Sequence, residues 1–201
     1  MNEISTSVLK KAASGDTGAF EQIMRHYEKL IYSITYRMFM NKEDAEDMLQ
    51  EVFVKAYKNM KNCKTWKHFK AWLCAIATHT CIDELRRRKN KGTESLDDAY
   101  ASNGEALVSR LSVCAAGVLP IPEDAAVRSE NRRELQNALN KLSEDDKLLI
   151  VLRDIEGFTY NETAEIAGLN LGTLKSRLFR ARAKLKTLYL AEQTAAENVI
   201  D

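Results

Sequence analysis

The sequence predicts an all-α protein in which two small helical domains are joined by a flexible linker. Its 201 residues include 8 glycines and 2 prolines, whereas average usage of roughly 7% and 5% gives about 14 and 10. So few turn formers argue against a β-sandwich or barrel and favour helices with short connections. Apolar residues also recur at three- and four-residue steps on both sides of a compositionally distinct stretch.

The first domain is predicted to span residues 1–91 and to contain four helices. The first helix runs from Ile4 to Ala13, and Gly15 and Asp16 mark its end and the cap of the next helix. The other three helices are long and one-sided, with apolar stripes over residues 20–38, 45–60 and 69–85.

A linker is predicted over residues 92–127. The stretch from Gly92 to Asp124 holds both prolines, six acidic residues and one basic residue, which gives a net charge of −5. Its hydrophobic pattern is irregular apart from residues 106–113, which are compatible with a short helix. This composition is typical of a flexible connection.

The second domain is predicted over residues 128–190, followed by a C-terminal tail, 191–201. Its first helix is marked by apolar residues between Leu135 and Leu142. Ser143 caps the next helix, because its hydroxyl can accept a backbone amide proton while the acids that follow face the positive helix end.

A helix-turn-helix is predicted at the end of this domain. Thr159 and Glu162 have the spacing of a capping box and begin a short helix. A tight turn at Gly168 follows, and Asn170 caps a last helix with leucines on one face. A short helix, a glycine-containing turn and a second helix form the sequence pattern of this motif.

Basic and aromatic residues alternate in the second half of the first domain. No acid occurs between Val52 and Ile82, and residues 52–91 hold eleven basic and two acidic residues, a net charge of +9. Such charge can follow a phosphate backbone, and aromatic faces can stack on unpaired bases. The aromatics on the apolar stripe are interpreted as core residues: Phe53, Phe69 and Trp72. For Trp66, core packing and base stacking both remain open.

The last helix is also basic, with six bases and no acid between Ala167 and Ala191. Its leucine face leaves four polar residues on the outer face near the helix start, where a recognition helix meets base edges: Lys175, Ser176, Arg177 and Arg180. The alternative is that the basic helix balances acidic neighbours, with Glu162 and Glu165 as candidates.

One helix of the first domain carries the opposite charge, with five acids and no base between Glu43 and Glu51. The helix N-terminus accounts for Glu43 and Asp44, but Asp47 and Glu51 lie too far along the helix. An acidic face beside a basic domain predicts a basic protein partner.

No catalytic residue, metal site or cofactor is predicted. The three histidines are scattered, no glycine-rich phosphate loop occurs, and the four cysteines form no CxxC pair. The longest uncharged apolar run, residues 71–77, is far shorter than the roughly 18–20 residues of a membrane span. With no secretory signal visible, we expect a cytoplasmic protein without membrane insertion, enzymatic activity or small-molecule substrate.

Three segments, in this order along the chain, resemble bacterial sigma factors of the extracytoplasmic-function (ECF) type. Asp44–Tyr57 resembles the helix that binds core RNA polymerase, and Phe69–Ala77, continued by Asp83–Arg88, resembles the promoter −10 segment. Gly157–Ala164 and Gly172–Arg182 are similar to the second sigma domain. The resemblance implies a region 2 domain and a region 4 helix-turn-helix domain, and it leaves only the linker unmatched.

The resemblance implies an alternative sigma factor that binds core RNA polymerase and directs initiation at promoters with −10 and −35 elements. The implied polymerase-binding residues are Asp44, Glu46, Asp47, Gln50, Glu51 and Phe53. Contacts to a partly single-stranded −10 element are implied for Asn62, Lys64, Trp66, Lys67, His79, Asp83, Arg86 and Arg87. Contacts to a double-stranded −35 element are implied for Thr173, Lys175, Ser176, Arg177 and Arg180.

The resemblance further implies an anti-sigma partner and a linker that lies near the RNA exit path. Two positions depart from the family pattern: His79 stands where asparagine is frequent, and Thr163 replaces an aliphatic residue.

The main alternative function is a helix-turn-helix operator-binding regulator with an N-terminal sensing or dimerisation domain. A basic protein of membrane surfaces is a weaker one, because the basic helices leave no spare apolar face.

Overall fold

The computed structural model describes residues 4–63, 66–91 and 134–197. The chain divides into two compact units whose boundary, between Gly117 and Val118, falls within the predicted linker. The predicted linker, residues 92–127, and its short helix lie outside the described residues, as does Lys64. The described residues form helices and short connections, so the all-α prediction is confirmed.

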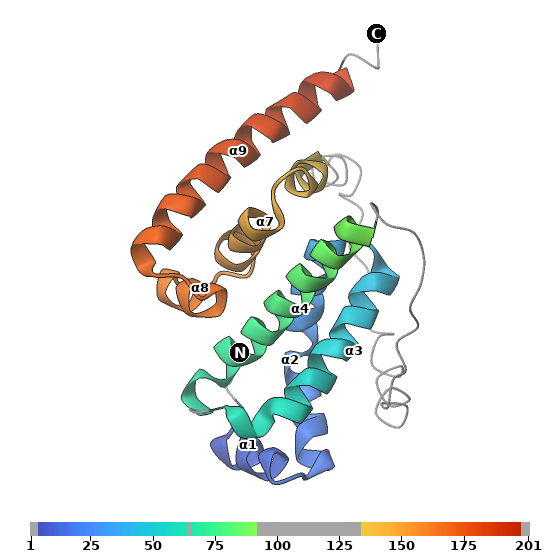
Figure 1. Cartoon of the computed structure of the whole chain (residues 1–201), viewed down its shortest axis with the longest axis vertical. Coiled ribbons are helices and arrows are strands. Elements are labelled where there is room, and N and C mark those ends of the chain that lie inside the picture. Colours follow the sequence, from blue (N-terminus) through green and yellow to red (C-terminus); the bar gives the residue numbers. More distant parts are fainter. Residues whose placement is uncertain (1–3, 64–65, 92–133, 198–201) are drawn as a thin grey trace, which may run out of the picture. The chain divides into compact units, whose positions relative to one another are not determined.

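Unit 1 packs four α-helices into a small bundle, coloured blue to green in Figure 1. Two 3-10 turns connect α3 to α4. The elements are α1 (Thr6–Ala13), α2 (Thr17–Phe39), α3 (Lys42–Asn59), η1 (Met60–Asn62), η2 (Trp66–His68) and α4 (Phe69–Lys91). The helices follow the order and number that the sequence predicts.

Local capping chemistry sets the helix boundaries of unit 1. The Asp16 side chain accepts a hydrogen bond from the backbone amide of Ala19 at 3.0 Å and starts α2, as predicted. Met40 ends α2 in the left-handed region with φ +58°. Asn41 then caps α3 by accepting from the Asp44 backbone amide at 3.2 Å, so α2 and α3 are joined by only two residues.

The core of unit 1 comes from the apolar stripes of α2, α3 and α4. The Phe20 ring contacts Phe53 and Tyr57 edge to face, with centroids 6.4 and 4.9 Å apart. The Thr35 hydroxyl donates to the Ala45 carbonyl at 3.0 Å, so a buried polar group between α2 and α3 is satisfied. The fully buried large side chains of this core are Phe20, Ile23, Ile31, Ile34, Met38, Phe53, Met60, Phe69 and Leu73.

The described part of unit 2 begins with a helical segment at residues 134–140 and ends with a long helix. Its further elements are α7 (Glu144–Ile150), a π-helical turn η4 (Val151–Ile155), α8 (Tyr160–Ala167) and α9 (Leu171–Glu197). Helix α9 continues to Glu197 and so extends into the segment predicted as a C-terminal tail, residues 191–201. The apolar stripe alone could not locate this end, because polar residues also form helix.

The caps predicted for unit 2 are confirmed. The Ser143 hydroxyl accepts from the Asp146 amide at 3.3 Å. Thr159 and Glu162 form the reciprocal capping box at the start of α8. Gly168 ends α8 with φ +63°, a left-handed conformation that glycine adopts without steric cost. Asn170 accepts from the backbone amide of the third residue of α9 at 2.8 Å.

The core of unit 2 holds α9 against α7 and α8. Its buried apolar residues are Leu139, Leu142, Leu149, Ile150, Ala164, Leu174, Leu178 and Ala181. Thr163 is buried as well, and its hydroxyl donates to the Thr159 carbonyl at 2.8 Å, which satisfies the polar group at this unusual position. Within the described part of the chain, no helix is long and apolar enough to cross a membrane.

Candidate functional site

The acidic face of α3 lies on the side of the helix opposite its buried stripe. Asp47 is exposed, whereas Glu46, Gln50 and Glu51 are half-buried. Two of these acids pair with lysines one helical turn away. Glu46 lies 3.8 Å from Lys42, and Glu51 lies 2.7 Å from Lys55. Asp47 pairs with no base among the described residues, so its charge is the most available on this face.

Asp44, at the start of the same helix, has a partner on α4. Its carboxylate accepts a hydrogen bond of 2.6 Å from the guanidinium of Arg88. That bond lowers the pKa of Asp44. The side chain of Asp44 is 26% exposed, so it contributes less to the outer face than the prediction assumed.

Phe53 requires a correction, because it was included among the implied polymerase-binding residues. Its side chain is fully buried, with 0% exposed, and its ring packs against Phe20. It therefore cannot touch a partner in this conformation. The core interpretation from the apolar stripe is confirmed for Phe53, as it is for Phe69, while Trp72 is half-buried and its ring centroid lies 5.4 Å from that of Phe69.

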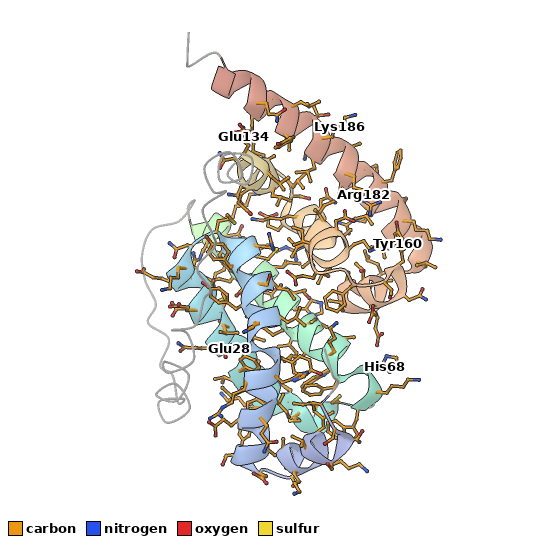
Figure 2. The ribbon with its side chains drawn as sticks, turned by 180° about the vertical axis from the view of Figure 1, so that it is seen from behind. Glu28, His68, Glu134, Tyr160, Arg182 and Lys186 are labelled. Atoms are coloured by element: carbon orange, nitrogen blue, oxygen red, sulfur yellow. The ribbon has the colours of Figure 1, made fainter. Side chains whose placement is uncertain are left out.

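The turns between α3 and α4 present part of the predicted −10 surface. Asn62 is exposed and its amide donates to the Asn59 side chain at 3.3 Å. Lys67 is exposed, and Trp66 is half-buried in η2, so part of its ring surface faces solvent. His68 lies beside them at the entry to α4 (Figure 2).

The remaining −10 candidates lie along the outer side of α4. His79, Asp83, Arg86 and Arg87 are all exposed, and spacings of three and four residues place them on one face. Arg87 donates two hydrogen bonds, of 2.7 and 2.8 Å, to Glu84. Part of its charge is therefore compensated within the helix.

The predicted −35 face is exposed on the first half of α9. Lys175, Ser176 and Arg180 are exposed, and Thr173 is half-buried. Arg177 is only 28% exposed, and its guanidinium lies 3.6–3.7 Å from the carboxylates of two acids in the first turn of α7, Asp145 and Asp146. The charge of Arg177 is thus partly compensated by acids of its own unit, and only part of the side chain is exposed.

Arg182 has a stronger intramolecular partner. Its guanidinium donates two hydrogen bonds, of 2.9 and 2.5 Å, to Asp154 in η4. It lies next to Tyr160 at the start of α8 (Figure 2), and its hydrogen bond to the phenol lowers the pKa of Tyr160. Arg153 covers the same ring, with its guanidinium carbon 4.6 Å from the ring centroid. The acids that pair with Arg177 and Arg182 therefore lie on α7 and η4.

Sequence reasoning missed Phe179, which lies between Leu178 and Arg180 on α9. Its side chain is 74% exposed, more than any other large hydrophobic side chain of the described residues. A phenylalanine so exposed on an otherwise basic face suits apolar contact with a base, such as a thymine methyl group. Its position off the leucine stripe was the signal that could have identified it.

Neither unit contains a candidate metal centre in its described residues. No group of three or more His, Cys, Asp or Glu side chains is placed to hold an ion there. Cys63, Cys74 and Cys81 are buried and form no disulfide within the described residues.

The two units match two models of one protein family. Residues 23–91 match Sigma-70 region 2, and residues 132–185 match Sigma-70, region 4. The chain is 35% identical to the ECF RNA polymerase sigma factor SigW of Bacillus subtilis over 178 residues, which covers 89% of this chain and 92% of SigW. It is 31% identical to SigE of Mycolicibacterium smegmatis, covering 91% of this chain and 67% of that protein.

Solved structures show the same fold. CnrH, solved in complex with the cytosolic domain of CnrY, aligns with a TM-score of 0.60 at 23% identity over 92% of this chain and 96% of CnrH. The sigma factor RpoE of Bartonella quintana, solved with the anti-sigma factor NepR, gives a TM-score of 0.62 at 24% identity over 84% and 95%. Because the two family models together cover more than half of the chain, the protein belongs to the RNA polymerase sigma factors and, by its relatives, to their ECF type.

Proposed function

We propose that this sigma factor docks on core RNA polymerase through the acidic face of α3 and contacts promoter DNA through α4 and α9. As an ECF sigma factor, it directs promoter-specific transcription initiation. Sigma factors in general are not enzymes, and the proposal gives this chain no catalytic step. Each interface is proposed from exposed charge on a helix whose opposite face is buried.

The polymerase interface is centred on Asp47. Its carboxylate is exposed, and Gln50 lies next to it, half-buried, one turn further along α3. Charge complementarity with a basic partner accelerates encounter and favours the right partner. The buried residues Val52 and Phe53 support this face from behind.

The −10 interface comprises η1, η2 and the outer side of α4. Residues His79, Asp83 and Arg86 offer polar contacts along one face, and Asn62 and Lys67 lie in the preceding turns. Opening a promoter requires bases to leave the stack, which costs a few kcal/mol and is offset by contacts to the extruded base. Trp66, half-buried next to these polar groups, is the candidate for such a stacking contact.

The −35 interface is the outer face of α9, and its exposure is the observation that carries the proposal for unit 2. Leu174 and Leu178 are buried with 0–1% exposed, while Lys175, Ser176 and Arg180 remain exposed. This face begins at the capped N-terminus of the second helix of a helix-turn-helix, the end that enters the major groove in this motif. Arginine there suits guanine, and Lys175 and the flanking basic side chains suit phosphates.

Reconstituted transcription tests the proposal. Core polymerase with the full chain should produce specific transcripts from a cognate promoter, and Asp47→Arg should weaken both polymerase binding and transcription. Glu21→Arg is the matched control, because it reverses an acid in an exposed α2 pair with Arg25 in the same unit. Equal transcription with and without the chain, or an Asp47→Arg protein that binds like wild type, would refute the polymerase interface.

The operator-binding regulator finds no support, because both family models and the relatives are sigma factors. A pull-down with core polymerase separates a sigma factor from an operator-binding regulator directly.

We also propose that an anti-sigma factor binds this chain. Exposed basic side chains on α4 and on α9 give each unit a surface that an acidic inhibitor could cover. Competition between such an inhibitor and promoter DNA would test this.

A further inference from the structure

Arg88, near the end of α4, contacts three separate segments of unit 1. Its Nη2 atom donates to Asp44 Oδ1 on α3 at 2.6 Å, and its Nε atom donates to Glu84 Oε1 on α4 at 2.7 Å. The guanidinium carbon also lies 5.2 Å from the ring centroid of Phe39, the last residue of α2. One side chain thus joins the end of α2, the first turn of α3 and the end of α4.

These contacts converge where α3 begins. The Asp44 backbone amide donates to the capping residue Asn41, and its carboxylate is bound by Arg88. The hydrogen bond to Asp44 raises the pKa of Arg88. Arginine favours such sites, because its planar fork can bind two carboxylates and its face can stack on an aromatic ring.

Asp44 and Asp47 therefore differ, although the sequence places both in one acidic run. Asp47 is exposed and pairs with no base in the described chain, whereas the carboxylate of Asp44 is directed to Arg88. An acid already engaged in a charge-assisted hydrogen bond has less to offer a second basic partner. Its effect on docking must pass through the pair that it forms.

We propose that Arg88 is a positioning residue for polymerase docking and that Asp44 acts through Arg88 instead of contacting the polymerase. The pair fixes the first turn of α3 against α4, and this orients the exposed acidic face one turn further on. The proposal rests on the proposed function of α3. The pair of Asp44 and Arg88 also joins α3, the helix proposed to bind polymerase, to α4, the helix proposed to contact the −10 element.

A double-mutant cycle on the full chain tests this assignment. The affinity for core polymerase is measured for Asp44→Ala, Arg88→Ala and the double variant. Both changes break the contact between Asp44 and Arg88, so we expect Asp44→Ala to lose about fivefold in affinity and the double variant to lose no more than Arg88→Ala alone. Asp44→Glu, which keeps the carboxylate, should restore affinity to near the wild-type value.

The control cycle combines Arg88→Ala with Glu21→Ala, which removes the acid of an exposed α2 pair with Arg25. Glu21→Ala should leave the affinity unchanged in both backgrounds, because Glu21 lies outside the proposed docking face. Asp47→Ala alone should lower the affinity. All variants are measured at a temperature where circular dichroism shows them folded, so reduced stability alone does not change the affinity. Multiplying losses for Asp44 and Arg88, or a failure of Asp44→Glu to restore affinity, would overturn the positioning role. An Asp47→Ala variant with unchanged affinity would instead refute the proposed docking face itself.

Discussion

Lys175 and Arg182 carry the same charge on α9, but the structure predicts different effects on DNA binding when each charge is removed. Lys175 is exposed and pairs with no acid in the described residues. Arg182 donates two hydrogen bonds to Asp154. Charge counting along the sequence treats the two alike, whereas the geometry leaves Lys175 available to DNA phosphates and engages Arg182 within the fold.

The size of the difference follows from counterion release. Each phosphate neutralised on duplex DNA contributes about −0.9 to the slope of log K against log salt concentration. Lys175→Gln should therefore make this slope less negative by about 0.9. The ratio of variant to wild-type affinity should consequently rise about 3.5-fold between about 50 and 200 mM salt. Arg182→Gln should leave the slope unchanged and lower the free energy of unfolding by about 0.2–1 kcal/mol, as for other partly exposed ion pairs.

The assay is fluorescence anisotropy of holoenzyme titrated onto a labelled duplex that carries the −35 element, at a series of salt concentrations. Comparing the slopes of the variants with that of wild type removes the large contribution that the polymerase itself makes to the salt dependence of binding. Equal changes of slope for the two variants would show that Arg182 reaches the phosphates and that its pair with Asp154 does not persist on DNA. An unchanged slope for Lys175→Gln would show that this side of α9 does not lie against the duplex.

Three further perturbations test the described structure. Phe53→Ala should lower the free energy of unfolding by about 3–5 kcal/mol in urea titrations, because it empties a buried site; a loss below about 1 kcal/mol would contradict that burial. Phe179→Ala should change stability by no more than about 0.5 kcal/mol yet weaken binding to the −35 duplex, because its exposed ring suits apolar contact with a base; unchanged binding would show that the ring makes no such contact. The hydrogen bond from Arg88 lowers the pKa of Asp44 below its ordinary 3.8, so its stabilisation is full above that pH and is lost as pH falls through the lower, folded-state pKa. Asp44→Asn should consequently lower stability near neutral pH, with a difference that shrinks in acid unfolding titrations; a pH-independent difference would count against the ion pair.

Local chemistry explains why so many boundaries could be predicted. The caps at Asp16, Ser143, Thr159 and Asn170 involve partners three residues away, so the residue types and their spacing suffice. The apolar stripes likewise identified which side of α2, α3 and α9 is buried, since a helix repeats every 3.6 residues regardless of its surroundings. The end of α9, at Glu197, has no such local signal.

The sequence by itself determined the helical class, the helix-turn-helix and the separation of charge into an acidic helix and two basic ones, because these depend on spacing within single helices. Only the tertiary structure decided which charges remain available. Asp44 and Arg88 are 44 residues apart, and Asp154 and Arg182 are 28 apart. Whether such groups meet depends on how whole helices pack, and the burial of Phe53 likewise depends on neighbours from α2. Distances across the fold, which no local pattern encodes, thus separate the residues free to bind partners from those that hold the protein together.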